Sequence, residues 1–180
     1  MSSLETILRD LPGHVAAELK ALLPDLRTAR ATTGRFDLGR LSTEGIAAPA
    51  VLVSILRLAH DEEFAGDHHG FLLHMGCFIV TTNAMGQPAD ATAATIAQAI
   101  LSRVAGTDWG LEDCGEVRDL KSEPIVSQGT LSAKASLWVV HWRQPVAFEA
   151  IVPNTTQVRL FVAEGPEAEP ADYVEIGGAP

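Results

Sequence analysis

With 180 residues, the chain is long enough for one domain that buries a substantial core. It is 47% hydrophobic and 20% charged, a balance typical of globular proteins. The net charge of −10, with 13 Lys and Arg residues and no run of them, argues against a sequence-specific DNA-binding protein, which needs a basic patch. Apolar runs such as 47–58 and 71–80 are shorter than a membrane-spanning helix, and residues 1–10 lack a signal-peptide core, so we expect a cytoplasmic chain without a membrane partner.

Residues 3–23 predict an amphipathic helix. Ser2 or Ser3 is a suitable cap for its start, and Pro12-Gly13 predicts a kink or two short helices, because proline removes a backbone donor. The apolar side chains recur at spacings of three and four, which is the period of one helix face: Leu4, Ile7, Leu8, Leu11, Val15, Leu19 and Leu22.

Three segments of strand length follow. Residues 27–33 are rich in threonine, and residues 50–58 are β-branched or aliphatic. Residues 71–82 are almost continuously apolar, which predicts a strand covered on both faces. The polar residues 60–70 are expected to connect the last two strands.

The most regular helix pattern covers residues 91–104, with Asp90 as its expected cap. Short strands are predicted at 116–120 and 124–128, a long one at 131–146 and a last one at 157–163. Helices and strands in this order predict an α+β fold, an antiparallel or mixed sheet with helices packed on one side. We expect a domain over 1–146 and an acidic extension over 147–180, which holds six acidic residues and one basic residue.

One segment gathers side chains that bind divalent metals in other proteins. Its spacing matches no zinc motif, and it lies between two expected strands, so the solvated tip of a hairpin is favoured over a metal site, and no cofactor is predicted. The residues of this cluster are His60, Asp61, Glu62, Glu63, Asp67, His68, His69 and His74.

No catalytic arrangement stands out, so we do not expect an enzyme. Cys77 and His74 are close in sequence, but on one strand they point to opposite faces. A Gly-x-Ser-x-Gly elbow, a Walker A loop and a Gly-x-Gly-x-x-Gly fingerprint are all missing from the sequence.

Aromatic and basic residues late in the chain are candidates for a subunit interface. Trp138 and Trp142 share one face of the segment 131–146, and Arg143 follows directly. Burial of the two tryptophans in the chain's own core is the alternative. His68 and His69 are further interface candidates, because they lie in the loop expected between two strands.

The order of these elements resembles the small tail-completion proteins of tailed bacteriophages, in particular the Mu-like tail structural family and the tail terminators. The likeness covers about residues 3–146 and includes a late strand that ends in an aromatic-Arg pair, here Trp142-Arg143. The segments that carry it follow the first helix: "APAVLVSILRL", "GCFIVTTN", "DATAATIAQAILSRV" and "LSAKASLWVVHWRQPV".

The resemblance implies a structural subunit of the virion, made in the host cytoplasm, that forms a ring, expected to be a hexamer. Such a ring caps the tail tube and joins it to a neck or head-completion protein, while DNA passes through an acidic lumen without specific binding. Another head–tail connector or a minor tail protein is the alternative, and a metal-dependent enzyme that uses the segment from His60 to His74 is a third hypothesis.

Overall fold

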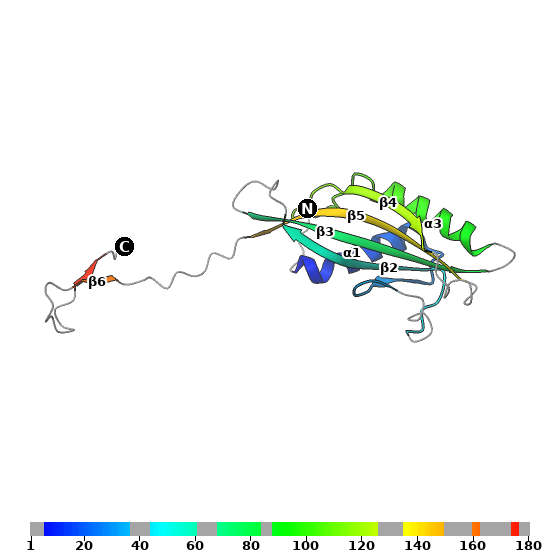
Figure 1. Cartoon of the computed structure of the whole chain (residues 1–180), viewed down its shortest axis with the longest axis horizontal. Helices are drawn as coiled ribbons and strands as arrows, with labels where there is room; N and C mark the ends of the chain where they lie inside the picture. The colour runs from blue at the N-terminus through cyan, green and yellow to red at the C-terminus, as the bar shows by residue number, and fades with distance from the viewer. Residues whose placement is uncertain are drawn as a thin grey trace. The chain divides into compact units, whose positions relative to one another are not determined.

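The computed structural model describes residues 6–36, 44–60, 68–83, 88–125, 135–149, 160–162 and 174–176. It divides into two units, Met1–Glu149 and Ala150–Pro180. The first unit contains a five-stranded sheet in the order β1-β2-β3-β5-β4. The sheet is mixed, because β1 is parallel to β2 and the other neighbours are antiparallel. The strands are β1 (Thr28–Ala31), β2 (Ala50–His60), β3 (His68–Thr82), β4 (Arg118–Pro124) and β5 (Ala135–Glu149), and Figure 1 shows the long ones side by side.

Two helices, α1 (Ile7–Leu22) and α3 (Ala89–Val104), cover one face of this sheet. The first packs on β1 and β2, and the second packs on β3, β5 and β4. Both contribute apolar side chains to one core cluster with the strands. The predicted α+β class, with helices on one side of a mixed sheet, is therefore confirmed. In the part of the chain that is described, no helix is long and apolar enough to cross a bilayer.

Helix α1 is continuous through Pro12-Gly13, so the expected break into two helices is wrong. The reason is burial: Pro12 itself lies in the apolar stripe that faces the sheet, together with Leu11 and Val15. Packing of such a stripe outweighs the loss of one backbone hydrogen bond. The expected caps Ser2 and Ser3 lie outside the described residues. At the start of the described helix, the backbone N–H of Thr6 donates to Asp10 at 3.2 Å.

Helix α3 begins at Ala89, one residue before the expected cap, so the assignment of Asp90 as the cap is wrong. The side chain of Asn83 accepts a hydrogen bond from the backbone N–H of Ala89 at 2.9 Å, and the Thr81 hydroxyl donates to the carbonyl of Ala89 at 2.7 Å. These contacts tie the helix start to the end of β3. Asp90 lies in the first turn, where the helix dipole favours a negative charge.

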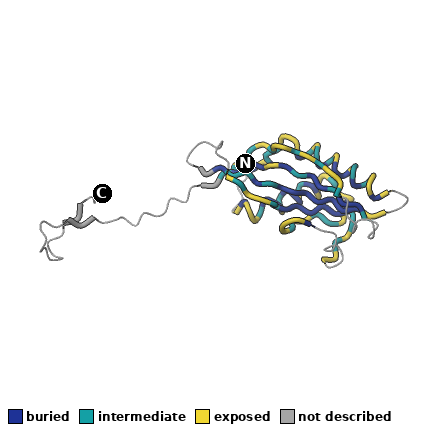
Figure 2. Tube along the Cα trace, viewed as in Figure 1, coloured by how far each residue is buried: buried dark blue, intermediate teal, exposed yellow. Residues whose placement is uncertain are grey.

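The two faces of the sheet have separate cores, because side chains alternate along a strand. In β3, residues such as Met75 and Cys77 lie under the helices, whereas Phe78 and Val80 point to the opposite face. Figure 2 shows buried residues along the middle of the long strands. The prediction that both faces of 71–82 are covered holds for residues 75–81, whereas Phe71, Leu72 and His74 are half-buried and Thr82 is exposed. The second core contains Phe36, Ala50, Leu52, Phe78, Val80, Leu137 and Val139.

Several strand boundaries differ from the expectation: β1 is shorter than the predicted 27–33, β2 extends to His60, and β3 begins at His68, inside the expected connection 60–70. Strand β4 overlaps the short strand predicted at 116–120, whereas residues 126–128 of the one predicted at 124–128 lie outside the described part. Strand β5 continues to Glu149, past the boundary expected after Val146, and the predicted residues 131–134 lie outside the described part. In the second unit, β6 (Leu160–Val162) lies within the predicted strand 157–163 and pairs with β7 (Val174–Ile176), which the sequence did not predict.

Candidate functional site

The two residues of the expected interface pair, Trp142 and Arg143, point to opposite faces of the sheet. Trp142 is only 1% exposed and belongs to the core under the helices, which favours the alternative of burial in the chain's own core. A role for it in an interface stays a prediction. Trp138 lies on the same face, half-buried against that core. Arg143 is exposed on the other face, because neighbouring residues of a strand alternate. Any contact that Arg143 makes on the open face therefore does not include the Trp142 ring.

A buried polar side chain, Gln144, holds the segment after α3 against the sheet. The indole Nε1–H of Trp109 donates to Gln144 Oε1 at 2.8 Å, and Gln144 Nε2 donates to the carbonyl of Gly115. The guanidinium of Arg103 lies over the Trp109 ring, 5.2 Å from its centroid. Trp109 and Trp142 pack with their ring centroids 6.1 Å apart. These contacts stabilise the fold and leave no reactive group exposed there.

The histidine-rich segment is only partly described. Asp61, Glu62, Glu63 and Asp67 lie outside the described residues, and so do the side chains of His68 and His69. The backbones of these two histidines begin β3 opposite Glu149 and Phe148. The His60 ring packs edge-on against Phe71, with centroids 5.7 Å apart. Within the described ranges, no three His, Cys, Asp or Glu side chains gather as metal ligands. The metal site stays a hypothesis, and so does the role of these histidines in an interface.

Both cysteines are buried and poorly ionised. Burial raises the pKa of the Cys77 thiol far above its ordinary value. Burial, with the nearby charges of Asp113 and Asp108, raises the pKa of Cys114 to about 12. Because the thiolate is the nucleophile, neither side chain is activated for covalent chemistry. His74 lies on the face opposite Cys77, as the strand period predicted.

Basic side chains line up across the sheet face that the helices leave open. Arg57 of β2 pairs with His74 of β3, His74 pairs with Arg143 of β5, and Arg143 pairs with Arg118 of β4. In the next row, His141 of β5 pairs with Lys121 of β4. Like charges directly opposite each other on neighbouring strands destabilise a sheet. In this row, Arg118 and Arg143 are the permanent cations that lie directly opposite each other.

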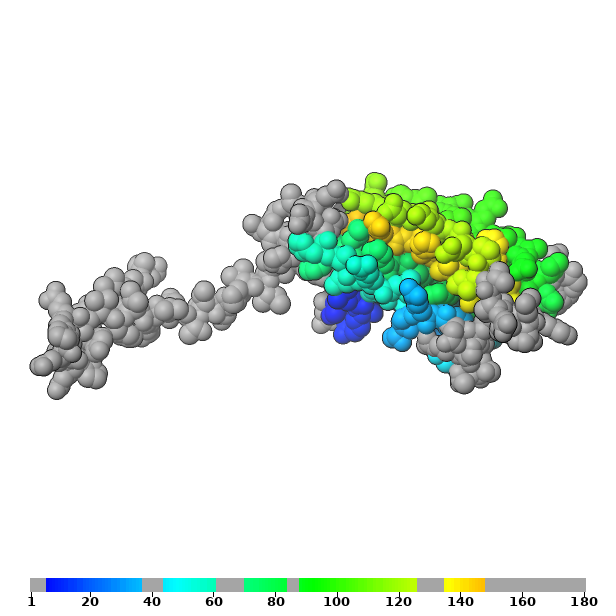
Figure 3. Space-filling model, in the orientation of Figure 1, coloured from blue at the N-terminus to red at the C-terminus, as the bar shows by residue number. Residues whose placement is uncertain are grey.

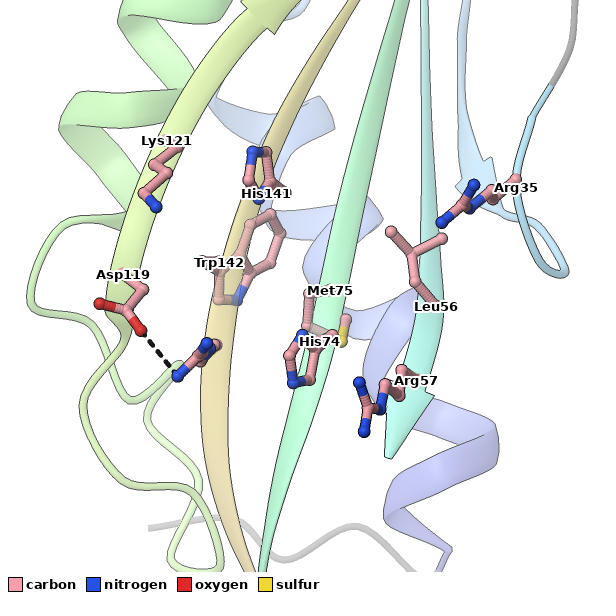
Figure 4. Close-up of a pocket in the computed structure, with 10 residues that line it drawn as sticks. Arg35, Leu56, Arg57, His74, Met75, Asp119, Lys121, His141 and Trp142 are labelled. Carbon is pink, nitrogen blue, oxygen red and sulfur yellow. Dashed lines mark ion pairs between the residues drawn. The ribbon is translucent and has the colours of Figure 1, made fainter. Parts of the chain in front are cut away.

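A hollow of about 440 Å³ lies over these rows. We call it the basic groove, and Figure 4 shows its side chains. Its one carboxylate belongs to Asp119, whose left-handed backbone, with φ of 50°, falls at the register shift of β4. Asp119 Oδ2 lies 3.0 Å from Arg143 Nη1. The side chains that define the groove are Arg35, Leu56, Arg57, His74, Asp119, Lys121, His141 and Arg143.

The electrostatics of the groove are strongly positive for a chain that is acidic overall. Burial, together with Arg143 and Arg57, lowers the pKa of His74, while Asp119 opposes this effect. His74 is therefore neutral near pH 7, and the groove presents four permanent cations against one carboxylate. Among the described residues, no carboxylate pairs with Arg35, Arg57 or Lys121. The arrangement is suited to binding carboxylates or phosphates.

The floor of the groove depends on Gly76. A Cβ atom at this position would lie 2.9 Å from Leu56 Cδ1, because the Leu56 side chain folds across the glycine. Leu56 sits at the bulge between Ile55 and Arg57, which shifts the register of β2. The bulge turns Arg57 toward His74 and gives the groove a small apolar floor between its cations.

Sequence reasoning missed most of this site. Of the groove residues, only Arg143 was an interface candidate, and His74 was assigned to the metal cluster instead. Arg35, Arg57 and Lys121 lie on separate elements with no basic run near them. The alternation of each strand was a usable signal, but the alignment of one strand with another decides which residues meet. That alignment depends on the bulges at Leu56 and Asp119.

Comparisons with known proteins give weak likenesses of structure, of which two are described here. No family model matches the chain, and no curated protein matches it. A chain from the virion of a native gene transfer agent particle is 16% identical, with a TM-score of 0.41, over 73% of this chain and 86% of that chain. The sheath/tube terminator of an extracellular contractile injection system, PVC, in its extended state is 13% identical, with a TM-score of 0.35, over 94% and 66%. Both scores are low, so the α+β assignment rests on the helices and strands described above.

Proposed function

We propose that this chain is a structural subunit of a phage tail or of a phage-like particle. In this role it is a tail terminator: copies close into a ring, expected to hold six, that caps the tail tube and contacts a neck or head-completion protein. DNA passes through the ring without specific binding. The chain works through the surfaces it offers to its neighbours and performs no catalysis.

The observation that supports this proposal most directly is the order of the elements. The sequence resembles tail terminators in a helix, two strands, a helix and a late long strand. The structure has α1, β2, β3, α3 and β5 in that order, with β5 at 15 residues. The match concerns five of the seven described elements of the first unit rather than one motif.

A ring also requires surfaces on two flanks of each subunit. One flank is available along β2, because β1 pairs only with residues 50–53. Among the described strands, none pairs with the outer edge of residues 54–60. Unpaired strand edges recruit strands of other chains. Leu58 is 41% exposed near this edge, which adds apolar area for such a contact.

The second surface is the open sheet face. Figure 3 shows side chains of β2, β4 and β5 side by side at the surface of this face. Its groove holds cations at several positions, whereas both thiols of the chain are buried in the core cluster that includes the helices. This chemistry supports contact with a charged partner rather than a covalent reaction.

Deletion of the gene in a strain that produces the particles tests the proposal. Without a terminator, tail tubes should vary in length and remain unjoined to heads, and a plasmid copy of the gene should restore normal particles. An epitope-tagged chain, located by electron microscopy, should label the head-proximal end of the tail. Unchanged tails after deletion, or a label outside the tail, would exclude the role.

The same microscopy separates the alternative of another connector or a minor tail protein, because each occupies its own position along the particle axis. Light scattering on the purified chain measures ring size, since a hexamer has six times the chain mass of 19.1 kDa. Metal analysis of the purified chain, with His68→Ala and His69→Ala, tests the third hypothesis of a metal-dependent enzyme.

A further inference from the structure

The basic groove also points to a particular partner. We propose that it binds the acidic C-terminal segment, residues 164–180, of a second copy of this chain. The contact is intermolecular and joins neighbouring subunits, so every copy supplies one groove and one acidic segment.

The first argument is the local reversal of charge. Residues 1–149 hold 12 basic and 18 acidic side chains, a net charge of −6. Four of those 12 cations line one hollow: Arg35, Arg57, Lys121 and Arg143. Assembly of cations on one face costs free energy unless an anion neutralises them. The groove is therefore an anion-binding surface on a protein that is otherwise acidic.

The second argument is the composition of the segment. Residues 164–180 hold five acidic side chains and no basic one: Glu164, Glu167, Glu169, Asp172 and Glu175. The segment offers five unbalanced negative charges to the four cations. Because every copy of the chain carries one such segment and one groove, the two are present in equal numbers.

The third argument is the contact that the groove already makes. Arg143 Nη1 lies 3.0 Å from the carboxylate of Asp119, so the guanidinium in the groove is already placed to donate to a carboxylate. A guanidinium offers five N–H donors and is not saturated by one such contact. Arg57 lies beside His74 in the same row and has the same capacity.

A nucleic acid is a poorer occupant than the segment. Beyond the groove, a phosphate backbone meets the net negative charge of the rest of the unit. The groove rim also carries Glu123, whose Oε1 lies 3.8 Å from His141 Nε2. Four cations beside these carboxylates suit a short acidic peptide better than a long polyanion.

The experiment begins with binding in trans. A fluorescent peptide of residues 160–180, which keeps β6 together with β7, is titrated onto the full-length chain at low salt, and anisotropy is measured. We expect saturable binding that weakens as salt rises, because exposed charges are screened. The variant Arg57→Glu/Arg143→Glu should bind roughly tenfold more weakly. The control Arg27→Glu, an exposed arginine away from the groove, should bind nearly as the wild type does.

Mixing of two defective full-length chains tests the intermolecular contact. One carries Arg57→Glu/Arg143→Glu, and the other carries neutral amides at all five acidic positions of residues 164–180. The wild type should self-associate in sedimentation velocity, and each variant alone should lose this self-association. Their mixture should regain a two-chain complex, because one partner supplies the intact groove and the other supplies the acidic segment.

The proposal is overturned if the peptide does not bind, or if Arg27→Glu weakens binding as much as the groove variant. It is also overturned if the mixture stays monomeric, which would mean that any contact is made within one chain. Binding of duplex DNA that Arg57→Glu/Arg143→Glu abolishes, without binding of the peptide, would make nucleic acid the occupant. Circular dichroism confirms that each variant is folded. None of these results bears on the tail role, which the location of the chain in particles tests.

Discussion

Replacement of Gln144 with methionine tests how a buried polar side chain holds the segment around Trp109. Methionine has a similar length but makes neither hydrogen bond. The change leaves the Trp109 Nε1–H without its 2.8 Å partner and removes the donor to the Gly115 carbonyl. Gln144 is 0% exposed and Trp109 is 4% exposed, so water does not replace the lost acceptor easily.

The expected loss follows from these two groups. A buried donor without a partner costs about 1–3 kcal/mol. The carbonyl of Gly115 is in a half-buried residue and regains part of its bonding from water, so it adds up to about 1 kcal/mol. The apolar methionine side chain returns up to about 1 kcal/mol through burial. The free energy of unfolding should therefore fall by about 2 kcal/mol, the middle of the range that these contributions allow.

Urea denaturation followed by far-ultraviolet circular dichroism measures this loss. The matched control is Gln98→Met on the exposed face of α3, which should stay within about 0.5 kcal/mol of the wild type. A double-mutant cycle with Trp109→Phe should give a coupling of about 1–2 kcal/mol, because both substitutions remove one shared hydrogen bond. A change for Gln144→Met as small as that of the control, or strict additivity in the cycle, would refute this reasoning.

Three further predictions concern single side chains. In urea denaturation, Trp142→Ala should lower the free energy of unfolding by about 3–5 kcal/mol, because it empties a buried site. Arg143→Ala should lower it by about 0–1 kcal/mol, because it removes an exposed ion pair. Equal losses would contradict the placement of these neighbours on opposite faces of the sheet. Burial and two neighbouring guanidinium groups lower the pKa of His74, so as the pH falls the unfolded chain binds a proton at His74 before the folded chain does. The stability should therefore fall as the pH drops below about 6.5, and His74→Gln should flatten that part of a profile of melting temperature against pH. A profile that His74→Gln leaves unchanged would exclude the effect. Cys77 and Cys114 should react with a thiol reagent at neutral pH only after unfolding in urea, and rapid labelling of the folded chain would show that they are accessible.

The sequence predicted elements well where one periodic pattern decides the structure. Helix α3 was expected at 91–104 and covers Ala89–Val104, because its apolar residues repeat at helical spacing. Strand β2 was expected at 50–58 and covers Ala50–His60. The start of α3 was missed, since its contacts come from Thr81 and Asn83 at the end of β3. Such contacts depend on tertiary structure and leave no local pattern.

The candidate site was predicted less well, for a physical reason. Trp142 and Arg143 are adjacent in sequence, yet the strand sends one into the core and the other into the groove. Arg57 and Arg143 are far apart in sequence, yet both pair with His74. Composition shows an acidic chain, but only the strand register shows where its cations collect. A prediction of the groove would have required the positions of the register shifts in β2 and β4.

The alternation of side chains in β3 and β5 also bears on how this protein can change over time. Residues that point under the helices are fixed by packing, whereas His74 of β3 and His141 and Arg143 of β5 face the groove. A substitution at one of these three positions changes the groove and leaves both cores intact. New binding specificities can therefore arise by single substitutions beside residues that packing constrains. A systematic mutational scan should show tolerance that alternates with a period of two residues along 141–144 of β5, and lower tolerance on both faces where the second core begins.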